Sequence, residues 1–389
     1  MKQVLLLGGG HAHVHVLQRL AQQPLVGAQV TLVSPFDRQM YSGMVPGLVA
    51  GHYRAADCAI ALRPLAQAAS VRFVQASAVQ LHAAASQVQM DDGTLLGYDW
   101  LSLDTGAVMH RDHLPGAREH ALFVRPIEDF VQQLDAIWAR AAQRRLHITV
   151  VGAGAAGVEL ALAVQHRLGA PGTPGKPGTP GKPGGSATGV KVSLLTGGPA
   201  PLAGYAPAVM ARVQRTLAAM GVAVVRQGAA AVQAHAVLLA DGNRLPCDVA
   251  VLATGAQAPP WLAGSGLALD AQGFVSTTAT LQSASHPQVF AVGDVATRRD
   301  TPHAKSGVYA VRAGPALALN LQRAVAGLPL LAHRPPARTL NLVSCGNRSA
   351  IAAWGGWSAQ GRWVWWLKDR IDRGFVARYT VPGNVSRPP

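Results

Sequence analysis

Two glycine-rich loops constrain this chain more than any other feature of its sequence. The first spans Gly8 to His13 after the hydrophobic run Val4 to Leu7, and the second spans Gly152 to Gly157 after Ile148 to Val151. Each loop opens a stretch with helical periodicity. In this setting glycines let the backbone approach a pyrophosphate at a helix N-terminus. One such loop is weak evidence, whereas two indicate that the chain binds two dinucleotides.

The pattern around each loop predicts a doubly wound α/β fold. Helices are expected at Val14 to Gln22 and at about Val158 to Arg167, and strands follow them at Gln29 to Val33 and Val190 to Leu195. Three further strand-like runs end in Thr105-Gly106, Thr254-Gly255 and Gly293-Asp294.

These runs suggest two Rossmann-like dinucleotide-binding domains, one inserted in the other. We expect residues 1–115 and 265–330 to form the first domain, residues 116–264 the second, and residues 331–389 a small C-terminal region. A Gly, Pro and Lys-rich segment at 169–189 contains a collagen-like run from Gly172 to Pro183. So few triplets in one chain cannot make a stable triple helix, and we predict a disordered surface insertion.

Composition narrows the class of protein. Hydrophobic residues make up 49% and charged residues 14% of 389, which favours a globular protein with real cores. The formal charge of +15 is scattered, without a nucleic-acid motif, so we expect anionic cofactors, substrates or a membrane surface rather than nucleic acid. No apolar run reaches the roughly 18 residues of a membrane span, and the chain begins without a secretory signal, so we expect a cytoplasmic protein.

The cysteines and the first histidines predict neither a redox pair nor a metal site. The three cysteines lie too far apart for a redox pair or a cysteine-rich metal site: Cys58, Cys247 and Cys345. His11, His13 and His15 alternate along a predicted helix start, where only the first and last have i,i+4 spacing. We therefore predict no metal site, with His11 near a pyrophosphate and the other two packed.

With these motifs in this order, residues 1 to about 330 resemble the pyridine nucleotide-disulfide oxidoreductase superfamily, whose members are flavoproteins with two dinucleotide folds. Three stretches are similar to the flavoprotein module fused ahead of selenide water dikinase, a relative of the type II NADH dehydrogenases: Gly8 to His15, Tyr41 to Gly47 and Trp366 to Asp372. No kinase domain follows here, so a stand-alone version is expected.

The resemblance implies FAD in the first domain. Its pyrophosphate would lie over Gly8 and Gly10, and Asp294 would hold the ribitol and phosphate region. The remaining implied contacts are His11, Ser34, Thr105, Gly106 and Gly293.

Two positions depart from the family pattern. His13 replaces the third glycine, so the helix is expected to pack less closely on the strand. Ser34 replaces the acidic residue that binds the adenosine ribose, and its hydroxyl is a weaker partner than a carboxylate.

The second loop matches the nicotinamide-nucleotide site of the family. Its implied contacts are Gly152, Gly154, Gly157, Thr254 and Gly255. After the second strand of this domain the chain reads Thr196-Gly197-Gly198, which carries neither an acid for NADH nor an arginine for NADPH. The choice between the two nucleotides stays open, as does a fold that binds nicotinamide weakly.

Two residues are candidates for the catalytic site. Glu159 matches a family glutamate near flavin and nicotinamide and would orient the carboxamide; the alternative is a first-turn glutamate favoured by the helix dipole. Lys305 stands where type II NADH dehydrogenases carry glutamine and would stabilise the anionic reduced flavin; the alternative is a solvated loop lysine.

The resemblance implies hydride transfer from NADH or NADPH to flavin and then electron transfer to a second acceptor. Residues 41–47 lack the cysteine pair of a disulfide reductase, so a quinone or another small oxidant is favoured. Reduction of a selenium or sulfur species and a non-catalytic redox sensor are the alternatives.

The C-terminal region bears on the acceptor. Five tryptophans lie near Lys368, Arg370 and Arg373: Trp354, Trp357, Trp363, Trp365 and Trp366. Indole rings beside basic groups suit the cytoplasmic face of a membrane. A cover for the flavin domain and a homodimer contact are equally open alternatives.

Overall fold

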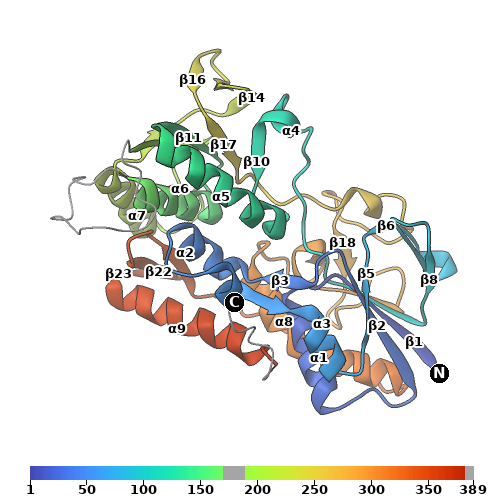
Figure 1. Cartoon of the computed structure of the whole chain (residues 1–389). Helices are drawn as coiled ribbons and strands as arrows, with labels where there is room; N and C mark the ends of the chain where they lie inside the picture. Colours follow the sequence, from blue (N-terminus) through green and yellow to red (C-terminus); the bar gives the residue numbers. More distant parts are fainter. Residues whose placement is uncertain (170–188, 382–389) are drawn as a thin grey trace, which may run out of the picture.

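Two five-stranded parallel sheets form the frame of the molecule (Figure 1). The computed structural model describes residues 1–169 and 189–381. The strands of the first sheet are, in spatial order, β19 (Val289–Ala291), β9 (Trp100–Leu103), β1 (Lys2–Leu7), β2 (Ala28–Ser34) and β5 (Arg72–Gln75). Those of the second are β10 (Ala121–Phe123), β17 (Val249–Leu252), β11 (Leu146–Val151), β12 (Val190–Leu195) and β13 (Ala223–Val225). Four neighbouring strands follow the same order in both sheets, but the fifth, at the edge, is the last of its sheet in the chain in the first (β19) and the first of its sheet in the second (β10). A glycine loop follows the middle strand of each sheet.

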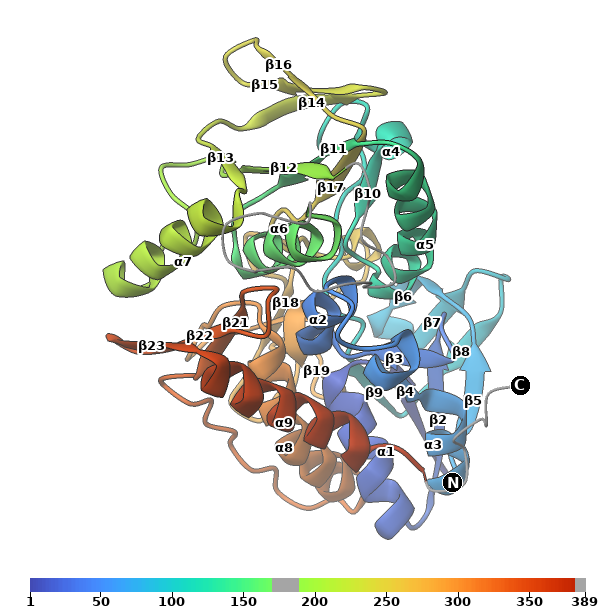
Figure 2. The ribbon, with the colours of Figure 1, turned by 60° about the vertical axis from the view of Figure 1, so that its left-hand side comes forward.

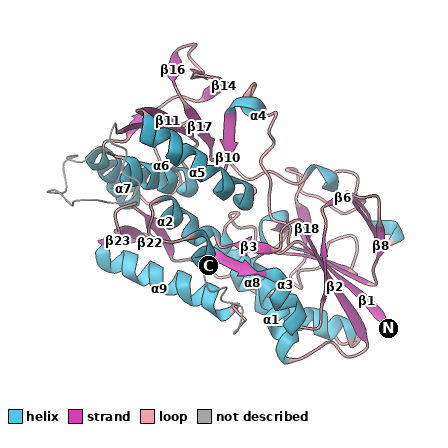
Figure 3. Ribbon diagram, viewed as in Figure 1, coloured by secondary structure: helices cyan, strands magenta, loops and turns pink. Residues whose placement is uncertain are grey.

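Helices accompany both sheets (Figure 3). Those of the first unit are α1 (His11–Gln22), α2 (Val45–Val49), α3 (Leu62–Ala68) and α8 (Gly307–Val325). Those of the second unit are α4 (Ala117–His120), α5 (Ile127–Gln143), α6 (Ala155–Leu168) and α7 (Pro207–Met220). The middle strands are apolar and buried, as expected for parallel strands covered on both faces.

Short sheets and 3-10 helices decorate this frame, and Figure 2 shows β14 to β16 at the outer end of the second unit. The antiparallel strands are β3 (Arg38–Met40), β4 (Ala59–Ala61), β6 (Ala78–His82), β7 (Gln87–Met90), β8 (Leu95–Gly97), β14 (Ala229–Gln233), β15 (Ala236–Leu239) and β16 (Arg244–Pro246). A parallel pair joins β18 (Val275–Thr277) and β20 (Ala296–Arg298). The 3-10 helices are η1 (Ser42–Met44), η2 (Ala55–Cys58), η3 (Ala83–Ala85), η4 (Pro260–Leu262) and η5 (Gly293–Val295).

The C-terminal region is a three-stranded antiparallel sheet followed by a long helix. Its elements are β21 (Asn341–Ser344), β22 (Ala350–Trp354), β23 (Trp357–Gly361) and α9 (Arg362–Arg378). The sheet packs on α6 and α7 of the second unit, while α9 packs on η1 and η2 of the first. This region therefore bridges the two units.

The prediction that the first helix begins at Val14 was wrong. Helix α1 begins at His11, because the side-chain carboxyl group of Asp104 accepts hydrogen bonds from the Ala12 and His13 amides. The cap comes from 92 residues away along the chain, so the local sequence could not show it. Helix α6 likewise begins earlier than expected, at Ala155.

The expected α/β fold class is confirmed by the two parallel sheets. Strands from both predicted parts of the first domain pair in one sheet, since β19 lies beside β9. The domain boundaries remain predictions, and the predicted insertion lies outside the described residues except at its ends, 169 and 189. Among the helices that the structure describes, none combines the length and apolar character needed to span a bilayer.

Candidate functional site

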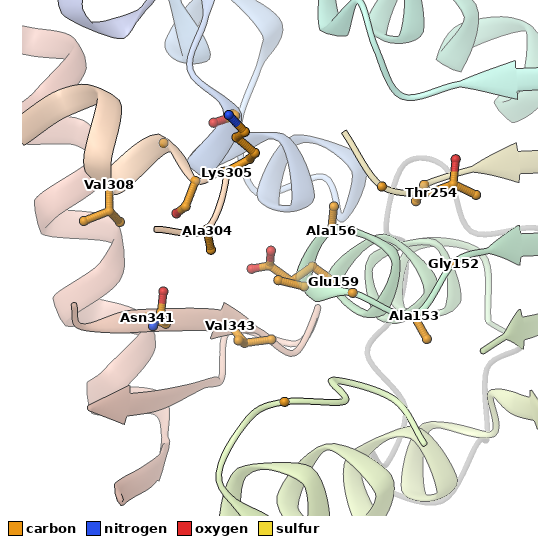
Figure 4. A pocket seen from close by; sticks show the side chains of 18 of the residues that line it. Gly152, Ala153, Ala156, Glu159, Thr254, Ala304, Lys305, Val308, Asn341 and Val343 are labelled. Carbon is orange, nitrogen blue, oxygen red and sulfur yellow. The ribbon is translucent and has the colours of Figure 1, made fainter. Parts of the chain in front are cut away.

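A large cavity lies between the second glycine loop, the segment around Lys305 and the C-terminal region (Figure 4). Its volume is about 1570 Å³. Single-ligand pockets are usually about 300 to 1,000 Å³, so this cavity has room for more than one substrate group. Five of its lining residues are Lys or Arg and two are acidic: Arg125, Lys305, Arg312, Arg338, Lys368, Glu159 and Asp372. This balance suits anionic ligands.

The second glycine loop forms one wall. The φ of Gly152 is +106°, a value that favours glycine, and a Cβ on Gly157 would lie 1.8 Å from the Gly152 carbonyl oxygen. In contrast, a Cβ on Gly154 or Gly255 would meet open space within the described structure. The loop is therefore tightly packed at Gly157, on the side of the protein interior, and open at Gly154 and Gly255, on the side of the cavity. This arrangement fits a pyrophosphate. The lining includes Gly152, Gly154, Thr254 and Gly255, whereas Gly157 lies behind it.

The cavity extends along this wall to Thr196 and Gly197 at the end of β12. The Thr196 hydroxyl donates to the Gly198 carbonyl, so the turn is closed on itself. It presents no charge to a ribose, as the sequence indicated.

Glu159 projects into the middle of the cavity from α6 (Figure 4). Its Oε1 accepts a hydrogen bond from the Ser344 amide at 2.7 Å. Burial raises the pKa of Glu159 to about 7, and the nearby Lys368 ammonium opposes that rise. The carboxyl group therefore changes charge near neutral pH. It is not the exposed first-turn glutamate of the alternative reading.

A buried ion pair forms the C-terminal wall. The Nζ atom of Lys368 donates to Asp372 at 2.6 Å and to the Gly43 carbonyl at 2.6 Å. Beside it, the rings of Tyr41 and Phe375 stack with centroids 4.4 Å apart. Lys368 is only 7% exposed, so its predicted place in a basic surface beside the tryptophans was wrong.

The first glycine loop lies outside this lining, in what we call the Asp104 cluster: Gly8, Gly10, Asp104 and Gly293. Two buried polar atoms beside it have no partner in the described structure, Nε2 of His11 and Oγ1 of Thr105. Gly106, with φ +74°, faces open space there. Unpaired buried polar atoms next to a glycine loop fit a polar cofactor such as FAD.

Asp294 connects this cluster to the cavity. Its carboxylate accepts a hydrogen bond from Arg125 at 3.0 Å, and Arg125 lines the cavity. Sequence reasoning missed Arg125, because nothing in its local pattern distinguishes it from a surface arginine.

Ser34 ends β2 and is buried, with its Oγ accepting from the Phe36 amide at 3.4 Å. It does not line the cavity. A role at the adenosine ribose stays a prediction.

Lys305 is one of the residues that line the cavity. Its side-chain amine, however, points away from Glu159 (Figure 4). The Nζ atom donates to the Ala296 carbonyl at 2.6 Å and to the Thr297 hydroxyl at 2.8 Å, and it lies 3.7 Å from the centroid of the Phe274 ring. Burial lowers the pKa of this amine to about 8. Its role toward flavin stays a prediction.

The three histidines of the first loop have separate partners. The rings of His13 and His15 contact Ser102 and Tyr379 respectively, while the His11 ring lies edge-to-face with Tyr41, their centroids 5.4 Å apart. Within residues 1–169 and 189–381, no three His, Cys, Asp or Glu side chains gather where they could hold a metal ion. All three cysteines are buried and none forms a disulfide, and none is among the described residues that line the cavity.

Four of the five C-terminal tryptophans are exposed, at 52 to 60%, and we call them the Trp face: Trp354, Trp357, Trp363 and Trp366. Trp365 instead packs inward, against the apolar cores and the ring of His52. Arg370 lies over the ring of Trp366 at 5.9 Å. The face is thus aromatic with basic groups at its side.

Comparison with known proteins identifies the family. The model of the pyridine nucleotide-disulphide oxidoreductase family matches residues 2–317. The chain belongs to this family. The expected superfamily, enzyme class and cofactors of this pyridine nucleotide-disulphide oxidoreductase, FAD with NADH or NADPH, are thereby confirmed.

Curated relatives of this pyridine nucleotide-disulphide oxidoreductase are distant. It is 26% identical to demethylphylloquinone reductase NdbB of Synechocystis, over 77% of this chain and 72% of the relative. It is 24% identical to the alternative NAD(P)H-ubiquinone oxidoreductase C1 of Arabidopsis thaliana, over 77% of this chain and 62% of that protein.

Solved structures share its fold. The NDH2 of Plasmodium falciparum in complex with NADH aligns with a TM-score of 0.77 at 13% identity, covering 100% of this chain and 99% of that one. The sulfide:quinone oxidoreductase of Aquifex aeolicus aligns with a TM-score of 0.76 at 18% identity, covering 99% and 93%. Both alignments extend through the C-terminal region that the family model does not match.

Proposed function

We propose that this enzyme oxidises NADH or NADPH through bound FAD and reduces a quinone. One observation carries the proposal: three features line the same cavity. They are the open second glycine loop, Arg125 with its bond to Asp294, and the wall formed by Tyr41, Phe375 and Lys368. A donor site, a link to the flavin side and an acceptor wall therefore lie together. The names of the two curated relatives support the acceptor class, since both are quinone reductases.

When bound, FAD accepts a hydride from the reduced nicotinamide and passes two electrons to the acceptor. The chain positions the nicotinamide. Gly154 and Gly255 leave room for its pyrophosphate, and Glu159 accepts a hydrogen bond from the carboxamide when it is ionised. The Ser344 amide fixes the direction of the Glu159 carboxyl group. Arg125 forms an ion pair with Asp294 at 3.0 Å, which holds the Asp294 side chain in place beside the first glycine loop.

The acceptor wall suits a flat, neutral ring with two carbonyl groups. The stacked rings of Tyr41 and Phe375 offer an apolar surface, and the Lys368 ammonium can donate to a carbonyl oxygen. Reducing a quinone to a quinol consumes two electrons and two protons, and NAD(P)H supplies one of those protons with its hydride. Glu159, with its pKa near 7, is placed to exchange the other with solvent. A disulfide substrate fits poorly, because no cysteine is among the described residues of the lining.

Anaerobic titration followed by steady-state assays tests the proposal. NADH or NADPH should bleach the flavin absorbance, and a water-soluble naphthoquinone should restore it and sustain turnover. Faster turnover with selenite or polysulfide than with quinone would favour the selenium or sulfur alternative. Flavin that neither nucleotide reduces would overturn the enzyme proposal in favour of a redox sensor.

The Trp face is the proposed contact with the cytoplasmic side of a membrane, where quinones are dissolved. Its indole rings are 52 to 60% exposed, with the Arg370 guanidinium beside Trp366. A homodimer contact is the competing use of the same surface.

Co-sedimentation with vesicles containing an anionic lipid separates these uses. Trp354→Ala with Trp366→Ala should lower the bound fraction at least about threefold, because each ring adds buried apolar area at the interface. Leu95→Ala, at a 53% exposed position on β8, is the matched control and should bind normally. A variant that binds vesicles like the wild type but becomes monomeric would support the dimer contact instead.

A further inference from the structure

Asp104 is a buried carboxyl group at the centre of the first glycine loop. It follows β9 and is 3% exposed. Its Oδ2 accepts hydrogen bonds from the Ala12 amide at 2.8 Å and the His13 amide at 3.0 Å, which belong to the first turn of α1. The N-cap residue Gly10 has no side chain to satisfy these donors. Asp104 therefore occupies a position at the helix N-terminus where dinucleotide folds favour negative charge.

Three glycines lie against Asp104, two of them beside its carboxyl group and one beside its backbone. A Cβ on Gly10 would lie 2.3 Å from its Cγ, and a Cβ on Gly293 would lie 2.8 Å from its Oδ1. A Cβ on Gly8 would lie 2.5 Å from the Asp104 carbonyl oxygen. The side chain is thus enclosed on several sides and has no room to turn away when a ligand arrives.

The groups facing Asp104 give it no cationic partner in the described structure. From α1, burial lowers the pKa values of His11 and His13 to about 4, so both rings are neutral. The Nδ1 of His13 donates to the Gly8 carbonyl at 2.6 Å, and its Nε2 accepts from Ser102 on β9. From η5, Asp294 adds negative charge, and Arg125 is already paired with it. Burial accordingly raises the pKa of Asp104 to about 8.

We propose that Asp104 carries a proton whenever the pyrophosphate of FAD lies on the first glycine loop, so that flavin binding and protonation of this carboxyl group are coupled. The neutral acid still accepts from both helix amides. It does so without placing a second anion beside the phosphates. The proposal rests on the assignment of FAD to this loop, and it requires no nicotinamide or acceptor.

The sign of the coupling follows from linkage. Below about pH 7 the carboxyl group is almost fully protonated, so FAD binding takes up almost no proton and its affinity is nearly constant. Above pH 8 the free protein holds a carboxylate that must be protonated on binding. The dissociation constant should then rise up to about tenfold for each pH unit.

Equilibrium dilution of the purified holoenzyme tests this, with released flavin measured by its fluorescence from pH 6.5 to 9.5. The wild-type dissociation constant should stay flat and then rise above pH 8. Asp104→Asn, which keeps an acceptor for both amides, should remove the rise and bind FAD more tightly than the wild type at pH 9.5. The control Asp294→Asn should weaken FAD at every pH but keep the rise, with its onset at a lower pH because the negative charge of Asp294 is gone.

Calorimetry of FAD binding to deflavinated wild-type protein gives an independent measurement. In two buffers of different ionisation enthalpy, the wild type should take up close to one proton per FAD at pH 9.5 and almost none at pH 7. A flat wild-type profile, no proton uptake at pH 9.5, or an Asp104→Asn variant that folds but loses FAD at all pH values would overturn the proposal. If the wild type binds no FAD at any pH, the cofactor assignment itself fails instead.

Discussion

The two glycine loops occupy equivalent places in their sheets, yet their helix N-termini differ. At the first loop, Asp104 bonds to the amides of α1. At the second, the equivalent position is Ala253: a Cβ on Gly8 would strike the backbone of Asp104, and one on Gly152 would strike that of Ala253. One side chain thus decides whether a helix N-terminus is open to an anion or already bonded to a carboxyl group.

The third position of the loops differs as well. At the second loop Gly157 lets α6 approach the Gly152 carbonyl closely. At the first, the buried ring of His13 donates to the equivalent carbonyl of Gly8 and also meets Ser102. The expectation that His13 only loosens helix packing was incomplete, because the imidazole replaces a close backbone contact with two hydrogen bonds.

The largest effect is expected from Gly157→Ala. Its Cβ would lie 1.8 Å from the Gly152 carbonyl oxygen, so the loop must shift. We expect a loss of stability of about 1 to 3 kcal/mol and at least a tenfold rise in the NAD(P)H concentration needed for half-maximal flavin reduction. Thermal denaturation and anaerobic stopped-flow measure the two. His13→Ala is the counterpart, and it should affect FAD retention rather than nicotinamide; the reverse pattern would contradict the comparison.

A smaller effect is expected from Ala253→Asp, which copies the first loop onto the second. A carboxyl group at this position would reach the first-turn amides of α6 and oppose the nicotinamide pyrophosphate. At pH 9.5, where a carboxyl group like that of Asp104 is ionised, NAD(P)H affinity should fall roughly tenfold, or about 1.4 kcal/mol. Ala253→Asn has similar size without the charge and is the control. Equal losses in both variants would show that size, not charge, distinguishes the loops.

The smallest effect concerns Glu159. It lies two residues after Gly157 in the second loop, the position that His15 occupies after His13 in the first. Because burial raises the pKa of Glu159 to about 7, its ionised fraction grows about tenfold from pH 6 to pH 8. The rate of anaerobic flavin reduction at low NADH should rise similarly and level off above pH 8. Glu159→Gln, which keeps an acceptor, should flatten this profile. An unchanged profile in the variant would remove Glu159 from the nicotinamide site.

The parts of the site that are formed by residues close together in the chain could be predicted from the sequence. Both glycine loops and the strands before them are contiguous patterns, and Gly152, Gly154 and Glu159 line the cavity. The parts that could not be predicted are formed by residues that lie far apart in the chain. Asp104 caps a helix 92 residues away, and Lys368 reaches Gly43 across 325 residues. Such contacts depend on tertiary packing, and no spacing of residues in the sequence predicts them.

The C-terminal region has a consequence for how the protein is made. Its Ser344 amide holds Glu159 and its Lys368 holds Gly43, so residues synthesised after both units tie the two together. A nascent chain on the ribosome can form both sheets while the cavity still lacks this wall. The order of synthesis therefore keeps the site incomplete until translation has passed α9.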